Sequence, residues 1–458
     1  MKPMSLQQLT ALLDGRMIGE DVSIAAVSTD SRTLPQGALF IALSGPNFDG
    51  HAFAAQVAQT GAVAVLVSRE CETSLPQLVV EDTRVALGQL AGWQREQFEQ
   101  PLVAVTGSNG KTTVKEMLAA ILGVGGEVLA TEGNLNNDIG MPLTLLRLED
   151  EQTAAVIEMG ANHAGEIAYL TEIARPNVAL ITNAGNAHLE GFGSLEGVAE
   201  AKGEIFSGLS SDGVAVINAD DRFAPRWREL AGSHRTLQFG IEHSADVTAS
   251  HIEMAVAGGA VTTRFELNTP IGSAAINLPL PGRHNVMNAL AATAAALAAG
   301  ANLDQVCRGL AAMTGPKGRL QLRAAHAGAQ LIDDSYNANP TSLKAGVEVL
   351  SGIGGHRWLV MGDMAELGDD AAALHAEVGV QAKALGIDRL YAVGELSAAA
   401  VEAFGAEAFH FESKEALIEA LRDQLAADVT LLVKGSRSAR MEQVVEGLSI
   451  DETSGAGH

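Results

Sequence analysis

Residues 106–113 have the sequence Thr-Gly-Ser-Asn-Gly-Lys-Thr-Thr and directly follow a short apolar run. A strand, a glycine-rich turn, a lysine and a hydroxyl residue are the parts with which a protein chain binds a nucleotide phosphate. Gly107 and Gly110 allow successive backbone N–H groups to point at phosphate oxygens. Lys111 adds a positive charge, and the Thr112 hydroxyl can bind Mg²⁺. The sequence therefore predicts a nucleotide site.

The loop departs from the usual motif, because only Ser108 and Asn109 separate its two glycines instead of four residues. An ordinary glycine turn between a strand and a helix is the alternative. The following segment, 113–122, has its apolar residues at the spacing of a helix with one buried face. The N-terminus of that helix lies at the loop, where its dipole favours an anion. This context favours the phosphate-binding loop.

Composition limits the classes of function. A chain of 458 residues is expected to form two or three domains. The net charge of −25 argues against binding DNA or RNA. The first 15 residues lack the apolar core of a signal peptide, and no run suits a membrane span. Cys71 and Cys307 are far apart in sequence, so we expect incidental thiols in a cytoplasmic protein.

The pattern of elements predicts an α/β fold with three domains, at 1–82, 83–313 and 314–458. A small N-terminal α/β domain is expected, with strands at 37–43 and 62–67 around a helix at 52–60. The other two domains alternate strands with helical segments, which is typical of parallel sheets. The expected strands lie at 103–106, 154–158, 178–182 and 214–218 in the central domain, and at 331–333, 358–361, 390–393 and 430–433 in a Rossmann-like C-terminal domain.

Between residues 246 and 280 apolar and polar residues alternate, which predicts an antiparallel extension of the central sheet with one solvated face. Two helices are expected after it, at 285–299 and 304–313. The turn-rich segment 314–318 (Thr-Gly-Pro-Lys-Gly) is the expected joint before the last domain.

Several polar residues follow the expected strands, where ligands bind in parallel sheets. Glu158 ends the second strand and is well placed to bind Mg²⁺ beside the phosphate loop, although a solvated glutamate is the alternative. His188 lies in a glycine-rich loop and is equally consistent with a ligand or a bystander. Asp220 and Asp221 are equally consistent with a site or with a helix cap.

Lys202 lies on one apolar helix face with Val198, Ile205 and Leu209. A lysine in such a position either extends its ammonium to water or is used in a site. The spacing alone favours the first interpretation. Elsewhere, polar residues gather at 282–288, at Arg319 and at 333–340, next to the expected joint, and this density suggests a cleft between domains, with a capped turn as the alternative.

Taken together, these segments resemble the Mur ligases, the ATP-dependent amide-forming family of peptidoglycan precursor synthesis. The resemblance covers nearly the whole chain, and in this family the phosphate loop has the same short form. The segments that carry it are 107–112 (Gly-Ser-Asn-Gly-Lys-Thr), 133–142, the strand of Glu158, the loop of His188, 201–206, 282–288 and 334–340.

The resemblance implies roles for the residues of the nucleotide site. ATP phosphates would be bound by the loop residues Gly107, Ser108, Asn109, Gly110, Lys111, Thr112 and Thr113. The rest of the nucleotide would meet Asn285 at adenine, Arg319 at the γ-phosphate and Asp334 at ribose. Two Mg²⁺ ions would be held by Thr112, Glu158, His188 and Lys202, with Lys202 converted by CO₂ into a carbamate. This reverses the preference that the spacing gave for Lys202, and it makes Lys111, Lys202 and His188 the expected catalytic residues.

Within the family, segments 334–340 and 361–368 are most similar to the members that add D-alanyl-D-alanine to UDP-N-acetylmuramoyl-tripeptide. The resemblance implies an acyl-phosphate intermediate, a monomer, and a third domain that binds the dipeptide and closes over the second. A folate polyglutamate synthetase is the alternative within the superfamily. A phosphotransferase or a nucleotide-gated binding module is a more distant one. The expected contacts of the UDP-substrate are Ser28, Asp30, Ser31, Arg32, Asn47, Asn136, Asn137 and Asp138.

Overall fold

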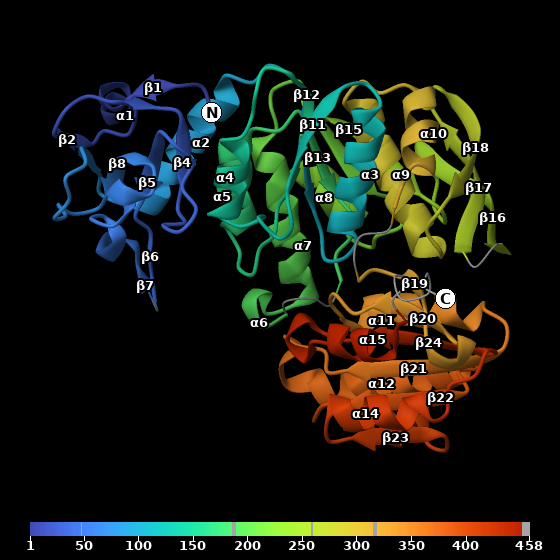
Figure 1. Cartoon of the computed structure of the whole chain (residues 1–458). Helices are drawn as coiled ribbons and strands as arrows, with labels where there is room; N and C mark the ends of the chain where they lie inside the picture. The colour runs from blue at the N-terminus through green and yellow to red at the C-terminus, as the bar shows by residue number, and fades with distance from the viewer. Residues whose placement is uncertain (47, 186–188, 258–259, 315–317, 451–458) are drawn as a thin grey trace, which may run out of the picture.

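A computed structural model gives the structure of the chain, and it describes residues 1–46, 48–185, 189–257, 260–314 and 318–450. The described residues form sheets of five, nine and six strands, which follow one another along the chain (Figure 1). The predicted α/β fold class is confirmed. In the same residues no helix combines the length and the apolar character that a bilayer span needs. Cys71 and Cys307 are free thiols.

The N-terminal sheet has the strand order β2-β9-β8-β5-β4. Its central strands β5 and β8 run parallel and are almost entirely buried, as their continuous apolar sequences predict. The elements are β1 (Met4–Ser5), α1 (Leu6–Leu12), β2 (Arg16–Ile18), β3 (Ser23–Ile24), β4 (Ala26–Ser28), β5 (Ala38–Ile41), β6 (Ser44–Gly45), β7 (Phe48–Asp49), β8 (Ala62–Val67) and β9 (Gln77–Val79).

The helix predicted for residues 52–60 is wrong. Two short 3₁₀ turns, Gly50–Phe53 and Val57–Gln59, occupy this segment instead. A 3₁₀ turn rises about 2.0 Å per residue against about 1.5 Å in an α-helix, so it covers more distance with few residues. Both turns lie in the connection 42–61, which returns the chain from the end of β5 to the start of β8.

The central sheet has the order β11-β12-β10-β13-β14-β15-β16-β17-β18. Strands β11 to β16 pair in parallel, and β17 and β18 form the predicted antiparallel extension. The elements are α2 (Thr83–Glu96), β10 (Leu102–Thr106), α3 (Lys111–Gly123), β11 (Glu127–Ala130), α4 (Gly140–Leu145), β12 (Gln152–Glu158), α5 (Glu166–Ala174), β13 (Val178–Ile181), α6 (Leu189–Phe192), α7 (Leu195–Gly203), β14 (Val214–Asn218), α8 (Ala224–Leu230), β15 (Arg235–Gly240), β16 (Val247–Ala257), β17 (Ala260–Thr269), β18 (Gly272–Leu278), α9 (Arg283–Ala298) and α10 (Leu303–Ala311).

Helices cover both faces of this parallel sheet. Val103 and Val105 of β10 pack in one core with α3, α9 and α10, whereas Ala104 belongs to the core on the opposite face, with α2, α4 and α5. The second core continues without a break into the N-terminal domain. Because both faces are buried, the strands read as unbroken apolar runs.

The C-terminal sheet has the order β19-β20-β24-β21-β22-β23, and all its strands except β19 pair in parallel. The C-terminal domain lies below the central one in Figure 1. Its elements are β19 (Gln321–Ala324), β20 (Gln330–Asp334), α11 (Pro340–Ser351), β21 (His356–Gly362), α12 (Ala371–Ala384), β22 (Arg389–Val393), α13 (Ala398–Phe404), β23 (Ala408–Phe411), α14 (Lys414–Arg422), β24 (Val429–Lys434) and α15 (Glu442–Leu448).

Candidate active site

The glycines of the phosphate-binding loop are required by the backbone. Gly107 has φ 144° and Gly110 has φ 82°, where side chains are strained. A Cβ atom on Gly107 would also lie 2.0 Å from the Thr182 hydroxyl, and one on Gly110 would lie 2.4 Å from Asn288 Oδ1. Helix α3 begins at Lys111 without a side-chain cap, so its first N–H groups stay available for an anion.

Lys111 folds back over this loop. Its ammonium donates to the Gly107 carbonyl at 2.7 Å and lies 3.4 Å from the Ser108 carbonyl. Burial lowers the pKa of Lys111, while the nearby Glu158 carboxylate raises it. The lysine is therefore already at the loop, where an incoming phosphate would provide the negative charge that favours its protonated form.

The Ser108 side chain and the Asn109 backbone connect the loop to the segment after β13. The Ser108 hydroxyl accepts from the Gly185 N–H at 2.9 Å, and the Asn109 N–H donates to Asn183 Oδ1 at 3.0 Å. The Thr182 hydroxyl donates to the Asn109 carbonyl at 2.6 Å. These bonds fix the shortened loop in place, so its backbone is ordered before any ligand arrives.

Glu158 ends β12 and is 3% exposed. Its Oε1 accepts from Asn136 Nδ2 at 2.8 Å, whereas its Oε2 is buried without a hydrogen-bond partner. A buried carboxylate oxygen without a partner is costly unless a cation meets it. Together with the half-buried hydroxyl residue Thr112, Glu158 provides the hard oxygen ligands that suit Mg²⁺. Within the described residues, no cluster of three or more His, Cys, Asp and Glu side chains forms a metal site.

Lys202 lies near the end of α7 and is 2% exposed, so the interpretation that its ammonium extends to water is wrong. Its neighbours on the stripe, Val198, Ile205 and Leu209, are buried as well. The described residues give the ammonium no hydrogen bond or salt bridge, and it lies 5.1 Å from the centre of the Phe192 ring. Burial and the charge of Lys111 lower its pKa to about 7. His188, the other expected ligand, lies outside the described residues.

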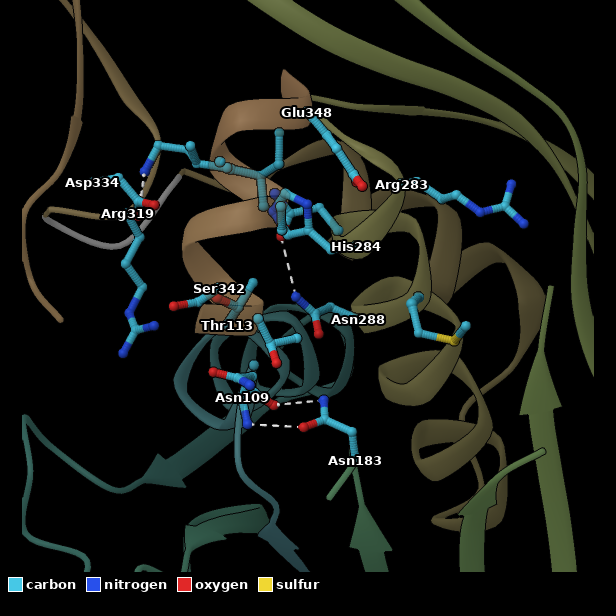
Figure 2. Close-up of a pocket in the computed structure, with 18 of the residues that line it drawn as sticks. Asn109, Thr113, Asn183, Arg283, His284, Asn288, Arg319, Asp334, Ser342 and Glu348 are labelled. Atoms are coloured by element: carbon cyan, nitrogen blue, oxygen red, sulfur yellow. Dashed lines mark hydrogen bonds between the residues drawn. The ribbon is translucent and has the colours of Figure 1, made fainter. Parts of the chain in front are cut away.

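A cavity of about 400 Å³ lies beside the phosphate loop, between the central and C-terminal domains (Figure 2). Arg319, Asp334 and Asn285 all line it, so the structure brings together three residues that were singled out far apart in sequence. Asn109, Gly110 and Thr113 of the loop region line it as well. Its remaining lining includes Asp220, Glu242, Arg283, His284, Asn288, Ser342, Glu348 and Lys434.

The structure adds two details of this cavity to the sequence-based expectation. The Asn285 side chain is engaged within its own helix region, since Nδ2 donates to the Pro281 carbonyl at 2.8 Å and Oδ1 accepts from Asn288 at 3.2 Å. His284, which the sequence did not single out, lies at the cavity wall. Burial, and then the charge of Lys434, lower its pKa to about 4, so its ring is neutral at pH 7. Its only sequence signal was its place in the polar segment that opens α9.

Arg319 lies with its guanidinium carbon 4.7 Å from the centre of the Tyr336 ring. This cation–π contact keeps the guanidinium at the side of the cavity formed by the C-terminal domain. The sequence left Asp220 with two interpretations, a site residue or a helix cap. In the structure its carboxylate accepts the N–H groups of Ile241, Glu242 and His243. Asp221 accepts the Ala184 and Phe223 N–H groups and thereby holds the segment after β13.

The residues expected to bind the other substrate lie elsewhere. Ser28, Asp30 and Arg32 form a local turn, in which the Arg32 guanidinium pairs with both Asp30 oxygens at 2.9 and 2.8 Å, and Ser31 lies within it. Asn136 binds Glu158, and Asn137 accepts the Gly140 N–H at the start of α4. Asp138 pairs with Arg84 at 2.9 Å. None of these described residues lines the nucleotide cavity, and Asn47 lies outside the described part of the chain.

One side-chain bond joins the phosphate loop directly to the C-terminal domain. Asn339 Nδ2 donates to Asn109 Oδ1 at 2.7 Å, while Asn339 Oδ1 accepts the Ser342 N–H and caps α11. The amide of Asn339 is thus held at both of its ends. It ties the position of the C-terminal domain to the predicted phosphate-binding loop.

Replacing Asn339 with serine should separate these two tasks. Serine caps a helix as well as asparagine does, but it is too short to reach Asn109. We expect Asn339→Ser to keep its melting temperature and to lose roughly three- to tenfold in kcat/KM for the nucleotide, the size of one neutral hydrogen bond. Steady-state assays at varied ATP concentration measure this. An unchanged kcat/KM would show that the bond does not couple the domain to the loop.

The arrangement defines a nucleotide-binding α/β protein in which the Rossmann-like C-terminal domain forms one wall of the nucleotide cavity. Family models match along the chain in the same order as its sheets. The Mur ligase family catalytic domain matches residues 23–95, the Mur ligase middle domain 105–296, and the Mur ligase glutamate ligase domain 318–437.

Individual relatives match over nearly the full length. The UDP-N-acetylmuramoyl-tripeptide--D-alanyl-D-alanine ligase of Escherichia coli strain K12 is 51% identical over 98% of this chain and 99% of its own. The crystal structure of MurF from Acinetobacter baumannii superimposes with a TM-score of 0.92 at 41% identity, covering 97% of this chain and 98% of that one. MurF ligase from Thermotoga maritima, solved with ADP, has a TM-score of 0.83 at 29% identity and covers 92% and 96% of the two chains. The chain belongs to the Mur ligase family.

Proposed function

We propose that this chain is the ATP-dependent ligase that joins D-alanyl-D-alanine to UDP-N-acetylmuramoyl-tripeptide. The products are UDP-N-acetylmuramoyl-pentapeptide, ADP and phosphate, and the step belongs to peptidoglycan precursor synthesis in the cytoplasm. The observation that carries the proposal is the 51% identity with a ligase of that name over almost all of both chains. An ordered phosphate loop that faces a cavity closed by the third domain agrees with it.

Activation by ATP is needed because an amine does not displace the oxygen of a free carboxylate at neutral pH. In the proposed reaction the terminal carboxylate of the tripeptide attacks the γ-phosphate, and ADP leaves. The amine of the dipeptide then attacks the acyl phosphate, loses a proton and expels phosphate. The loop N–H groups and Lys111 would neutralise the charge that develops on the transferred group, and Arg319 would reach it from the C-terminal domain.

The metal half of the site would be formed by Thr112, Glu158, His188 and Lys202. The partnerless Glu158 oxygen fits a divalent cation, and Mg²⁺ bound there would supply positive charge next to the ATP phosphates. The buried Lys202 ammonium fits conversion by CO₂, because a carbamate changes an unpaired buried cation into an anion that a second Mg²⁺ can partner. His188 is proposed as a ligand from the family resemblance.

The remaining substrates would occupy the outer domains. We place the UDP end at the N-terminal domain, through Ser28, Asp30, Ser31, Arg32 and Asn47. The segment Asn136, Asn137 and Asp138 would contact the peptide near the metals, since Asn136 already holds Glu158. The C-terminal domain would bind the dipeptide. We place the hinge that allows closure at the predicted joint 314–318, of which residues 315–317 lie outside the described part of the chain.

The test is to incubate the purified chain with ATP, Mg²⁺, UDP-N-acetylmuramoyl-tripeptide and D-alanyl-D-alanine, each omitted in turn. We expect ADP release only with the complete mixture, together with a product whose mass is that of the pentapeptide. ADP release that ignores the dipeptide would contradict the proposal. Release that needs a folate and glutamate instead would favour the folate polyglutamate synthetase.

A further inference from the structure

The nucleotide cavity contains a buried ion pair between Asp334, which is expected at the ribose, and Lys434, to which the proposed reaction gives no task. Asp334 is the last residue of β20 and Lys434 the last residue of β24, and the two strands pair in parallel with these residues side by side. The Lys434 ammonium lies 2.5 Å from Asp334 Oδ2, a contact that is drawn beside Asp334 in Figure 2. Lys434 is 3% exposed and Asp334 8%.

The pair is held firmly by its surroundings. The Lys434 ammonium also donates to the Asn337 carbonyl at 3.0 Å. Among the described residues, Asp334 Oδ1 has one weak partner, the Leu320 N–H at 3.3 Å, so this oxygen can accept another hydrogen bond. One carboxylate oxygen is therefore committed to the lysine, and the other stays available at the wall of the cavity.

Fold stability alone gives little reason to bury these charges. Removing two charges from water costs several kcal/mol per ion, and well-packed apolar residues often serve the fold equally well. The pair lies instead across the cavity from the phosphate-binding loop, where a nucleotide would present its sugar hydroxyls. A strand-end carboxylate that accepts a ribose hydroxyl is the usual arrangement in dinucleotide-binding sheets.

We propose that Lys434 is a positioning residue for nucleotide binding, which occupies Asp334 Oδ2 and so directs Oδ1 to accept a ribose hydroxyl. The inference rests on the proposed nucleotide site and assigns Lys434 no contact with the substrate. Without the ammonium the carboxylate is free to turn or to take up a proton. Either change removes a charge-assisted hydrogen bond to the sugar while the phosphate loop stays intact.

The charged surroundings of Asp334 agree with this role. Burial raises the pKa of Asp334, and the charges of Lys434 and then Arg319 lower it. His284, which faces Lys434 from α9, is neutral at pH 7, since its pKa is lowered to about 4. Loss of the Lys434 charge should therefore move the pKa of Asp334 upward, and its ionised form would be lost at a higher pH as the solution is acidified.

The experiment compares ADP, 2′-deoxy-ADP and 3′-deoxy-ADP by calorimetry with the full chain and Mg²⁺. We expect the parent chain to prefer ADP over one of the deoxy forms by roughly tenfold or more, as a hydrogen bond to a charged group provides. Lys434→Met should reduce this preference to about twofold or less, as loss of that bond requires. As the pH is lowered, ADP binding to Lys434→Met should also begin to weaken at a higher pH than ADP binding to the parent chain. A full preference in Lys434→Met would overturn the proposal.

Two further variants exclude a general structural effect. Lys434→Arg keeps the charge and should keep part of the preference, whereas a loss equal to that of Lys434→Met would contradict a role in the ion pair. In the double variant Lys434→Met/Asp334→Asn, ADP should bind as it does to Asp334→Asn alone, because Lys434 acts through Asp334. Additive losses would overturn the inference. An unchanged preference in Asp334→Asn would overturn the ribose contact itself, and dipeptide-dependent ADP release would still test the ligase reaction separately.

Discussion

Lys202→Ala should abolish amide formation, with a fall in kcat of roughly a thousandfold or more, comparable to the loss of an essential electrostatic group. The proposed carbamate needs the lysine amine, and without it the proposed second Mg²⁺ would lose a ligand next to the transferred phosphoryl group. The fold should survive. Removing a buried ammonium that has no hydrogen bond or salt bridge among the described residues relieves a desolvation cost, which offsets part of the cavity that alanine leaves.

Pentapeptide formation followed by mass spectrometry, together with a melting curve, measures both effects. Lys202→Arg distinguishes charge from carbamate, because arginine keeps a cation and does not form a carbamate with CO₂. It should be as inactive as Lys202→Ala. Near-normal turnover in either variant would mean that the buried lysine only fills space.

Lys115 provides a matched control in the same domain. It is also a buried lysine, 3% exposed, but its ammonium donates to the Thr131 carbonyl at 2.6 Å and pairs with Glu116 at 2.6 Å. Lys115→Met leaves the Thr131 carbonyl and the Glu116 carboxylate without this partner. We expect it to lower the melting temperature and to keep most of the turnover, which is the opposite pattern to Lys202→Ala.

The parallel cores were predictable from sequence because their pattern is local. Both faces of β10 are buried, so its apolar run is unbroken, and α3 shows the periodicity of a helix with one covered face. Elements at the edges of the sheets were not predicted, because they lack such a local pattern. Strand β23, at the edge of the C-terminal sheet, has half-buried and exposed residues throughout and no clear alternation. The turns that replaced the predicted helix at 52–60 depend on the distance between two strands, which periodicity does not report.

The residues of the candidate site also divide into those that a local sequence pattern revealed and those that it did not. The phosphate loop is contiguous, so its residue types alone indicated its chemistry. The burial of Lys202 depends on what packs around α7, and its spacing alone suggested the wrong environment. Bonds between residues far apart in sequence leave no local pattern. Two examples are Asn109 with Asn339, which joins two domains, and Asp334 with Lys434, which lies within the C-terminal domain. Lys434 ends an ordinary apolar strand, and only the strand order shows that it lies beside Asp334.

Lys111→Met should reduce ADP release and amide formation by roughly a thousandfold, in the range seen when a group that stabilises transferring charge is removed. Methionine has a similar length and leaves the glycine turn intact, so the backbone N–H groups that are proposed to bind the phosphates should remain in place. The loss should fall more on kcat than on the KM for ATP, because negative charge shifts toward the lysine as the phosphoryl group transfers.

Burial lowers the pKa of Lys111 before the nucleotide binds, and the carboxylate of Glu158 opposes this shift. Bound phosphates would add further negative charge, so the ammonium form is the one that would act in the proposed reaction. Lys111→Arg keeps that charge in a planar group that does not match the curled loop, where the ammonium lies 2.7 Å from the Gly107 carbonyl. We expect Lys111→Arg to bind ATP better than Lys111→Met and to remain slow in turnover. Equal kcat values for Lys111→Met and the parent chain, measured at saturating ATP, would show that the loop N–H groups and the metals alone stabilise the transferred phosphoryl group.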